Sequence, residues 1–165
     1  MQAPRRKYDK YPIVKIDPHI TTEKFNELEA KLEKLKKVKR PREAEEVKRL
    51  ALMGDFSENA GYQLAKGRLR GINQRILDIE DLLRRAEIIE TPGKDKVGLG
   101  NFVTILSEGK TKTYQILGSV ETNPLQGVIS HNSPLGAALM GKGAGDRVTV
   151  QLANKNKEYK ILKID

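Results

Sequence analysis

Two carboxylates stand alone in a basic stretch of the chain, within the segment Gly54-Asp55-Phe56-Ser57-Glu58. Asp55 and Glu58 are the only acidic residues between Glu46 and Asp78. Carboxylate oxygens are ligands that Mg²⁺ prefers, but two of them supply only part of its coordination shell. The pair therefore predicts half of a magnesium site, which a partner would complete. The same Asp-x-x-Glu spacing is also typical of a capping box at the start of a helix, which needs no metal.

Basic side chains surround this pair on both sides in the sequence. The 165-residue chain carries a formal net charge of +9, which favours a polyanionic partner such as nucleic acid or an acidic protein channel. A solvated surface that serves solubility is the alternative. The candidate binding residues are Lys48, Arg49, Lys66, Arg68, Arg70 and Arg75, and a second basic run consists of Lys34, Lys36, Lys37, Lys39, Arg40 and Arg42.

Several classes of site are excluded by composition. The chain has no cysteine, which excludes disulfides and thiolate metal sites, and its two histidines, His19 and His131, are too few for a His-rich zinc site. Ser57 lacks a nearby base, so a serine nucleophile is not expected. Because the sequence shows no apolar run of membrane-spanning length and no signal-peptide pattern, we expect a cytoplasmic protein without membrane contact.

The elements that position the carboxylates are two long helices. Thr21 begins an N-cap signature, and apolar residues then recur at steps of three and four, with Pro41 expected to kink or restart the first helix. We predict an antiparallel coiled-coil hairpin over residues 22–89 with its tip at residues 54–57. Its predicted apolar positions are Phe25, Leu28, Leu32, Leu35, Val38, Ala44, Val47 and Ala51 in the first arm, and Tyr62, Ala65, Leu69, Ile72, Ile76, Ile79, Leu83 and Ala86 in the second.

The chain changes character near Thr91-Pro92-Gly93, after which short alternating runs are separated by glycines. This half predicts a small antiparallel sheet with one short helix that opens at Ser133-Pro134. The fold class is therefore α+β. We predict a flexible extension over residues 1–18, a coiled-coil hairpin domain over 19–92 and a C-terminal domain over 93–165.

Several spaced motifs occur in order over residues 20–165, namely Lys39-Arg40-Pro41, Gly54–Tyr62, Asn132–Leu135, Ala138–Lys142 and Gly145-Asp146. Together they resemble the bacterial transcription elongation factors of the GreA/GreB family, which act in transcript cleavage. The stretch from Tyr62 to Ile72 is closer to GreB, whereas residues 57–60 fit either subgroup. Several motifs in the same order are more specific than any one of them.

The resemblance implies a C-terminal domain of FKBP-like fold and binding to backtracked RNA polymerase through its secondary channel. Asp55 and Glu58 would help to hold a Mg²⁺ ion shared with the polymerase active site, with no cofactor bound to the chain alone. The factor would stimulate cleavage of the nascent RNA 3′ end by the polymerase, without being an enzyme itself. Ser133 and Pro134 would lie near the polymerase contact, and the basic hairpin residues near RNA. We expect a monomer with weak contact to DNA or RNA.

Three alternative functions are weighed against this one. A regulator of the same fold that inhibits would be expected to alter the tip pair, which this chain retains, although Gly61 replaces an acidic residue usual in the family. An FKBP-like isomerase or peptide-binding module needs an aromatic-lined pocket, and residues 93–165 hold only Phe102, Tyr114 and Tyr159 as aromatic residues. A generic nucleic-acid-binding coiled coil would bind free DNA or RNA with strong salt dependence.

Overall fold

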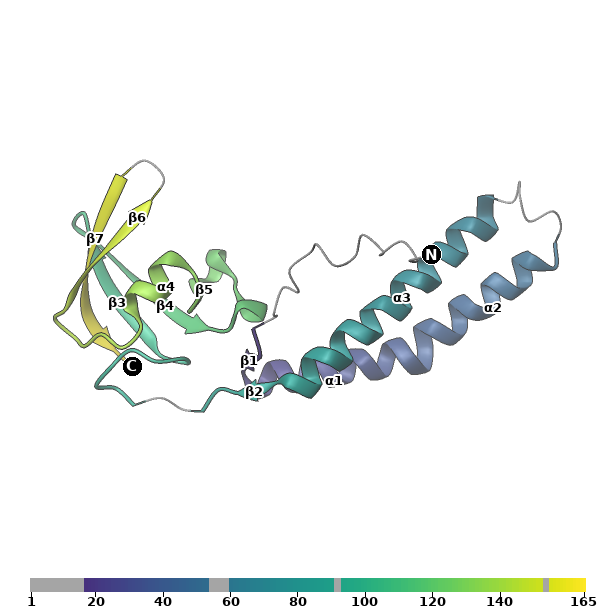
Figure 1. Ribbon diagram of the computed structural model, residues 1–165, viewed down its shortest axis with the longest axis horizontal. Helices are drawn as coiled ribbons and strands as arrows, with labels where there is room; N and C mark the ends of the chain where they lie inside the picture. Colours follow the sequence, from purple (N-terminus) through teal and green to yellow (C-terminus); the bar gives the residue numbers. More distant parts are fainter. Residues whose placement is uncertain (1–16, 54–59, 91–92, 153–154) are drawn as a thin grey trace, which may run out of the picture.

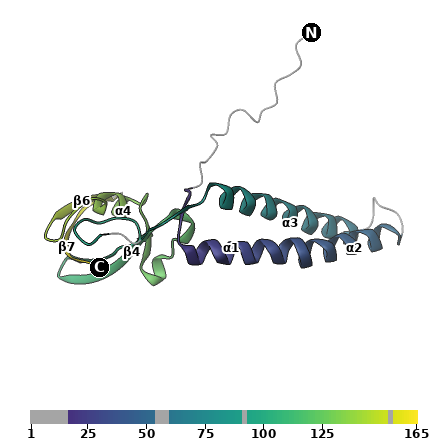
Figure 2. The same cartoon turned by 90° about the horizontal axis from the view of Figure 1, so that it is seen from below.

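The computed structural model describes residues 17–53, 60–90, 93–152 and 155–165. A helical hairpin forms one end of an elongated molecule, and a curled sheet with one short helix forms the other (Figures 1 and 2). The α+β class and the order of its two parts are therefore confirmed.

The first arm of the hairpin consists of α1 (Thr22–Lys34), a π-helical turn η2 (Leu35–Lys39) and α2 (Arg40–Ala51). Thr21 caps α1 as predicted, because its hydroxyl oxygen accepts the Lys24 backbone N–H at 3.1 Å. Pro41 has no N–H and its ring crowds the carbonyl one turn back. The chain accommodates the proline by widening the preceding turn, in which the Arg40 N–H donates to the Leu35 carbonyl.

The π-helical turn changes which residues face the second arm. Leu35 is buried as predicted, but the predictions for Val38 and Ala44 are wrong, since Val38 is 57% exposed and Ala44 is also exposed. A π turn holds one residue more than an α turn, so the inward face moves one position along the chain. Lys39 and Glu43 accordingly face the cleft between the arms.

The second arm, α3 (Ala60–Arg85), packs antiparallel to the first (Figure 2). Most of its predicted apolar positions are buried or half-buried, and Leu82, which the pattern missed, is buried as well. This packing stabilises the half of the hairpin nearer the sheet. Its buried core consists of Ile20, Leu28, Leu35, Ile76, Ile79 and Leu82.

Gly67 offers a test of how much a glycine inside α3 lowers the stability of the protein. A Cβ added there would have no atom within 4 Å apart from its own helix and chain neighbours. A glycine inside a helix costs about 0.8–1 kcal/mol relative to alanine. We therefore expect Gly67→Ala to raise the melting temperature by about 2–4 °C in thermal unfolding followed by circular dichroism. A lower melting temperature would show that the bare backbone at this position is needed.

The C-terminal sheet has the strand order β5-β4-β3-β7-β6. Its strands are β3 (Phe102–Ser107), β4 (Lys110–Leu117), β5 (Val128–Ser130), β6 (Arg147–Leu152) and β7 (Lys155–Ile164). The β3–β4 and β6–β7 pairs are antiparallel as predicted, and β3 also pairs antiparallel with β7. The prediction is wrong for β4 and β5, which run parallel, because the chain crosses over between them through the short helices η3 (Ser119–Glu121) and η4 (Pro124–Gln126).

The core of this domain lies between the sheet and the short helix α4 (Pro134–Leu139), which begins at the predicted proline. Leu139 is fully buried against strand residues that include Ile105, Ile116 and Ile161. Alternation of inward and outward residues along the strands explains this burial.

The two halves of the molecule meet at a junction that the sequence did not indicate. The strand β1 (His19–Ile20) pairs in parallel with β2 (Glu87–Ile88), which follows the second arm. The segment Gly118–Glu121 of the C-terminal domain lies against this pair. The Thr21 N–H and hydroxyl donate to the Glu121 carboxylate at 2.8 and 2.6 Å, so the residue that caps α1 also binds the sheet domain.

Candidate functional site

The predicted tip pair, Asp55 and Glu58, lies outside the described residues. The helices on either side of it are described: α2 ends at Ala51 and α3 begins at Ala60, both at the end of the hairpin farthest from the sheet (Figure 1). The roles of the two carboxylates therefore stay predictions.

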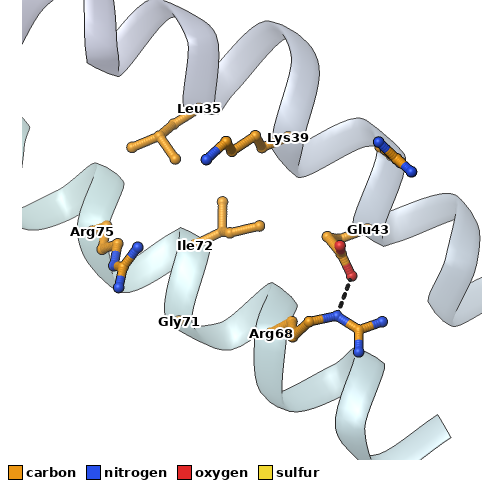
Figure 3. A pocket seen from close by; sticks show the side chains of 8 residues that line it. Leu35, Lys39, Glu43, Arg68, Gly71, Ile72 and Arg75 are labelled. Carbon is orange, nitrogen blue, oxygen red and sulfur yellow. Dashed lines mark hydrogen bonds and ion pairs between the residues drawn. The ribbon is translucent and has the colours of Figure 1, made fainter. Parts of the chain in front are cut away.

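Behind these helix ends, a cleft of about 440 Å³ lies between the two arms. It is located where the π-helical turn of the first arm faces α3, with Leu35 and Ile72 at its apolar base (Figure 3). Four cations and one carboxylate line it, so its electrostatic character is basic. The charged lining residues are Lys39, Arg42, Glu43, Arg68 and Arg75.

One ion pair joins the two arms at this cleft. The Arg68 Nε donates to the Glu43 carboxylate at 2.9 Å, and Figure 3 shows the pair beside Ile72. The Arg68 side chain is 52% exposed, so we assign the pair no more than about 1 kcal/mol of stability.

The other basic candidates are more dispersed. Arg49 forms two hydrogen bonds to Glu46 on its own helix, at 2.8 and 2.9 Å, and these lower the pKa of Glu46. The Lys66 ammonium lies 5.8 Å from the Tyr62 ring centroid, within cation–π distance. Lys48 and Arg70 have exposed side chains and do not line the cleft. The structure thus gathers Arg68 and Arg75 of the predicted set and leaves the others on the surface.

Lys39 and Arg42 are cleft residues that were not selected from the sequence as site residues. Both belong to the basic run over residues 34–42, which suggests a solvated face as readily as a site. Pro41 was the one sequence signal for the position of these two residues, since a proline inside a helical pattern disturbs the helix around it. The register change itself was not predictable from apolar spacing.

Ser133 and Pro134 have a defined structural role at the start of α4. The Ser133 hydroxyl donates to the Ser130 carbonyl at 2.7 Å and accepts the Gly136 N–H at 3.0 Å. Pro134 occupies the first helical turn, where its missing N–H costs nothing, and it is exposed. The exposed Pro134 therefore forms a corner beside the half-buried, hydrogen-bonded Ser133, a geometry compatible with a protein contact.

Among the described residues, no helix combines the length and the apolar character needed to cross a lipid bilayer. This finding agrees with the amphipathic pattern of both arms.

Comparison with known proteins places these features in a family. Residues 19–88 match the family model "Transcription elongation factor, N-terminal", and residues 92–165 match "Transcription elongation factor, GreA/GreB, C-term". The transcription elongation factor GreA of Lactococcus lactis subsp. cremoris is 41% identical over 150 residues, which cover 88% of this chain and 96% of the relative. GreA of Macrococcus caseolyticus is 42% identical over 149 residues, or 88% and 94% of the two chains.

A search of solved structures finds GreA factor homolog 1 of Thermus thermophilus, with 26% identity and a TM-score of 0.42 over 89% of this chain and 97% of that chain. The sequence matches decide the assignment, because two family models cover most of the chain and both of these GreA relatives exceed 40% identity over nearly their whole length. The chain belongs to the GreA/GreB family of transcription elongation factors.

Proposed function

We propose that this elongation factor binds backtracked bacterial RNA polymerase and stimulates the polymerase to cleave the nascent RNA 3′ segment. The hairpin enters the secondary channel, and the C-terminal domain contacts the polymerase surface near Ser133 and Pro134. One observation carries the proposal: a chain of this family retains two isolated carboxylates, Asp55 and Glu58, between the two arms of a long basic hairpin.

The donor chemistry of Asp55 and Glu58 suits Mg²⁺, which prefers carboxylate oxygens and accepts ligands from more than one molecule. A Mg²⁺ ion shared with the polymerase would supply activation of water for attack on an RNA phosphodiester. The chain's own part is to deliver the two carboxylates. In the sequence, both carboxylates precede α3, which begins at Ala60.

The basic cleft has a separate role in this proposal. Its lining cations can neutralise phosphate charge on the displaced RNA, and the arms hold them at a constant distance from the hairpin end. Such contacts are electrostatic and carry little sequence preference.

A rescue experiment tests the proposal. Stalled, backtracked elongation complexes are incubated with the chain, nucleotides are added, and the fraction that resumes RNA synthesis is measured. We expect rescue that depends on the factor. A lower fraction than without the factor would instead indicate the inhibitory alternative, and an unchanged fraction would contradict both.

The basic surface of α3 can be tested through Arg68, which lines the cleft, together with Arg70, which is exposed outside it. The double variant Arg68→Ala/Arg70→Ala is expected to act more weakly on complexes with long backtracked RNA. The difference from the parent should be largest at low salt and should shrink as salt rises, because screening weakens the phosphate contacts of the parent. Cleavage rates over a salt titration provide the measurement.

Glu43→Gln is the matched control, because it removes the ion pair between the arms and leaves both arginines in place. We expect it to act like the parent. If Glu43→Gln reproduced the defect of the arginine variant, Arg68 would serve only to join the arms.

A further inference from the structure

Both histidines of the chain converge on one carboxylate at the junction between the hairpin and the C-terminal domain. His19 Nδ1 lies 2.8 Å from one oxygen of Asp17, and His131 Nδ1 lies 3.4 Å from the other. When one ligand atom is taken from each of Asp17, His19 and His131, the three atoms lie within 4.8 Å of one another. Residues from the start of the described chain and from the C-terminal domain therefore lie in one cluster.

The Asp17 carboxylate is the centre of this cluster, with only 5% of its side chain exposed. Burial disfavours its charge, but hydrogen bonds from His19 and from the Ser119 N–H and hydroxyl outweigh burial and lower the pKa of Asp17. The Ser119 N–H donates at 2.7 Å. A buried, ionised carboxylate thus lies between two imidazoles.

A second carboxylate lies near one of the imidazoles on its outer side. Glu87 lies 3.4 Å from His19 Nε2, the ring nitrogen that faces away from Asp17. Histidines that bind metals usually donate their second ring N–H to a carboxylate in this way, which orients the ring and raises its basicity.

We propose that Asp17, His19 and His131 form a binding site for one Zn²⁺ ion, with Glu87 as the outer carboxylate that orients His19. Two imidazole nitrogens and a carboxylate oxygen are a ligand set that zinc accepts, with water in the fourth position. Ligands of a tetrahedral zinc ion lie about 3.3 Å apart, given bonds of about 2.0–2.1 Å. His131 Nδ1 lies 3.4 Å from one Asp17 oxygen, close to this value, and His19 Nδ1 lies 2.8 Å from the other oxygen.

Zinc bound here would join the two halves of the molecule. Asp17 and His19 precede the first arm, whereas His131 follows β5 in the C-terminal domain. The ion would add to the contact of Thr21 with Glu121 and stabilise one relative orientation of the hairpin and the sheet. The half-exposed ring of His19 gives an ion access from solvent.

Zinc titration of the full chain tests the site directly. The protein is prepared without a histidine tag, treated with a chelator and titrated with ZnCl₂ in a calorimeter. Because the chain has no cysteine and only two histidines, few other strong sites compete. We expect one Zn²⁺ per chain and, at 100 times the dissociation constant, a rise in melting temperature of about 5–10 °C. MgCl₂ should give no such rise.

Variants separate the proposed ligands from the rest of the junction. His131→Gln is expected to abolish the zinc-dependent rise, and Glu87→Gln to weaken zinc binding about 10–100-fold. Glu121→Gln is the matched control, since it perturbs a junction contact outside the cluster and should keep zinc affinity. Melting without zinc checks that each variant folds, and the visible spectrum of the Co²⁺-substituted parent reports tetrahedral coordination without any variant.

The site is refuted if the parent binds no stoichiometric zinc, or if His131→Gln binds it as tightly as the parent. An equal loss in His131→Gln and Glu121→Gln would also contradict it. These measurements need no polymerase, so their outcome is independent of the proposed function.

Discussion

The double variant Asp55→Asn/Glu58→Gln is expected to lose transcript cleavage by orders of magnitude while it folds and binds polymerase almost normally. Asn caps a helix about as well as Asp, and Gln closes a capping box in place of Glu. The substitutions therefore keep the capping role but remove the negative charges that Mg²⁺ requires. Cleavage is measured at saturating factor, together with a competition measurement of polymerase binding.

The matched control moves the same two substitutions along the hairpin. Glu45→Gln on α2 combined with Asp78→Asn on α3 changes net charge equally at exposed positions. It should stimulate cleavage at the parental rate. If the tip variant also stimulated cleavage at that rate, the proposed metal-binding role of the pair would be wrong.

Gly118→Ala is expected to disrupt the junction between the hairpin and the C-terminal domain. A Cβ at this position would lie 1.8 Å from the His19 carbonyl oxygen, a backbone atom that cannot move independently of β1. Overpacking of this kind costs about 1–3 kcal/mol. We expect a melting temperature lower by about 3–10 °C, measured by calorimetry.

Gly93→Ala serves as the control, because a Cβ there meets no atom within 4 Å beyond its chain neighbours. It should melt close to the parent. A parental melting temperature for Gly118→Ala would show that the two domains are not held by this contact.

Much of the architecture was predictable because it depends on local patterns. Helical spacing located both arms, the Thr21 cap set the first helix start, and glycines and alternating runs located the main strands. A glycine between two alternating runs also predicted the turn between β3 and β4, where Glu108 and Gly109 both have positive φ angles. These features arise from residues close in sequence.

The features that were missed depend on contacts between distant residues. The parallel pairing of β4 with β5 requires a crossover that carries no periodic signal. The widened turn before Pro41 shifted the inward face of the helix by one position. Lys39 therefore faces the cleft, although the apolar spacing predicted Val38 at the inward position. Asp17, which was placed in a flexible extension, hydrogen-bonds to Ser119, and no local pattern predicts such a partner.

The candidate site also has one part that the sequence indicates and another part that only the structure shows. The importance of Asp55 and Glu58 came from their isolation in a basic stretch and from family resemblance, and neither source gives their geometry. The basic cleft needed the structure, because Arg68 and Arg75 come from one arm and Lys39 and Arg42 from the other. Charge clusters formed across two helices are visible only when the register of both is known.

The most direct test of the central claim follows the RNA itself. Backtracked complexes whose RNA is labelled at the 5′ end are incubated with the chain and Mg²⁺ in the absence of nucleotides, and RNA length is read on a gel. We predict shortened 5′-labelled RNA that stays bound in the complex and still extends when nucleotides are added. RNA that keeps its full length at saturating factor, at the rate seen without factor, would contradict the account.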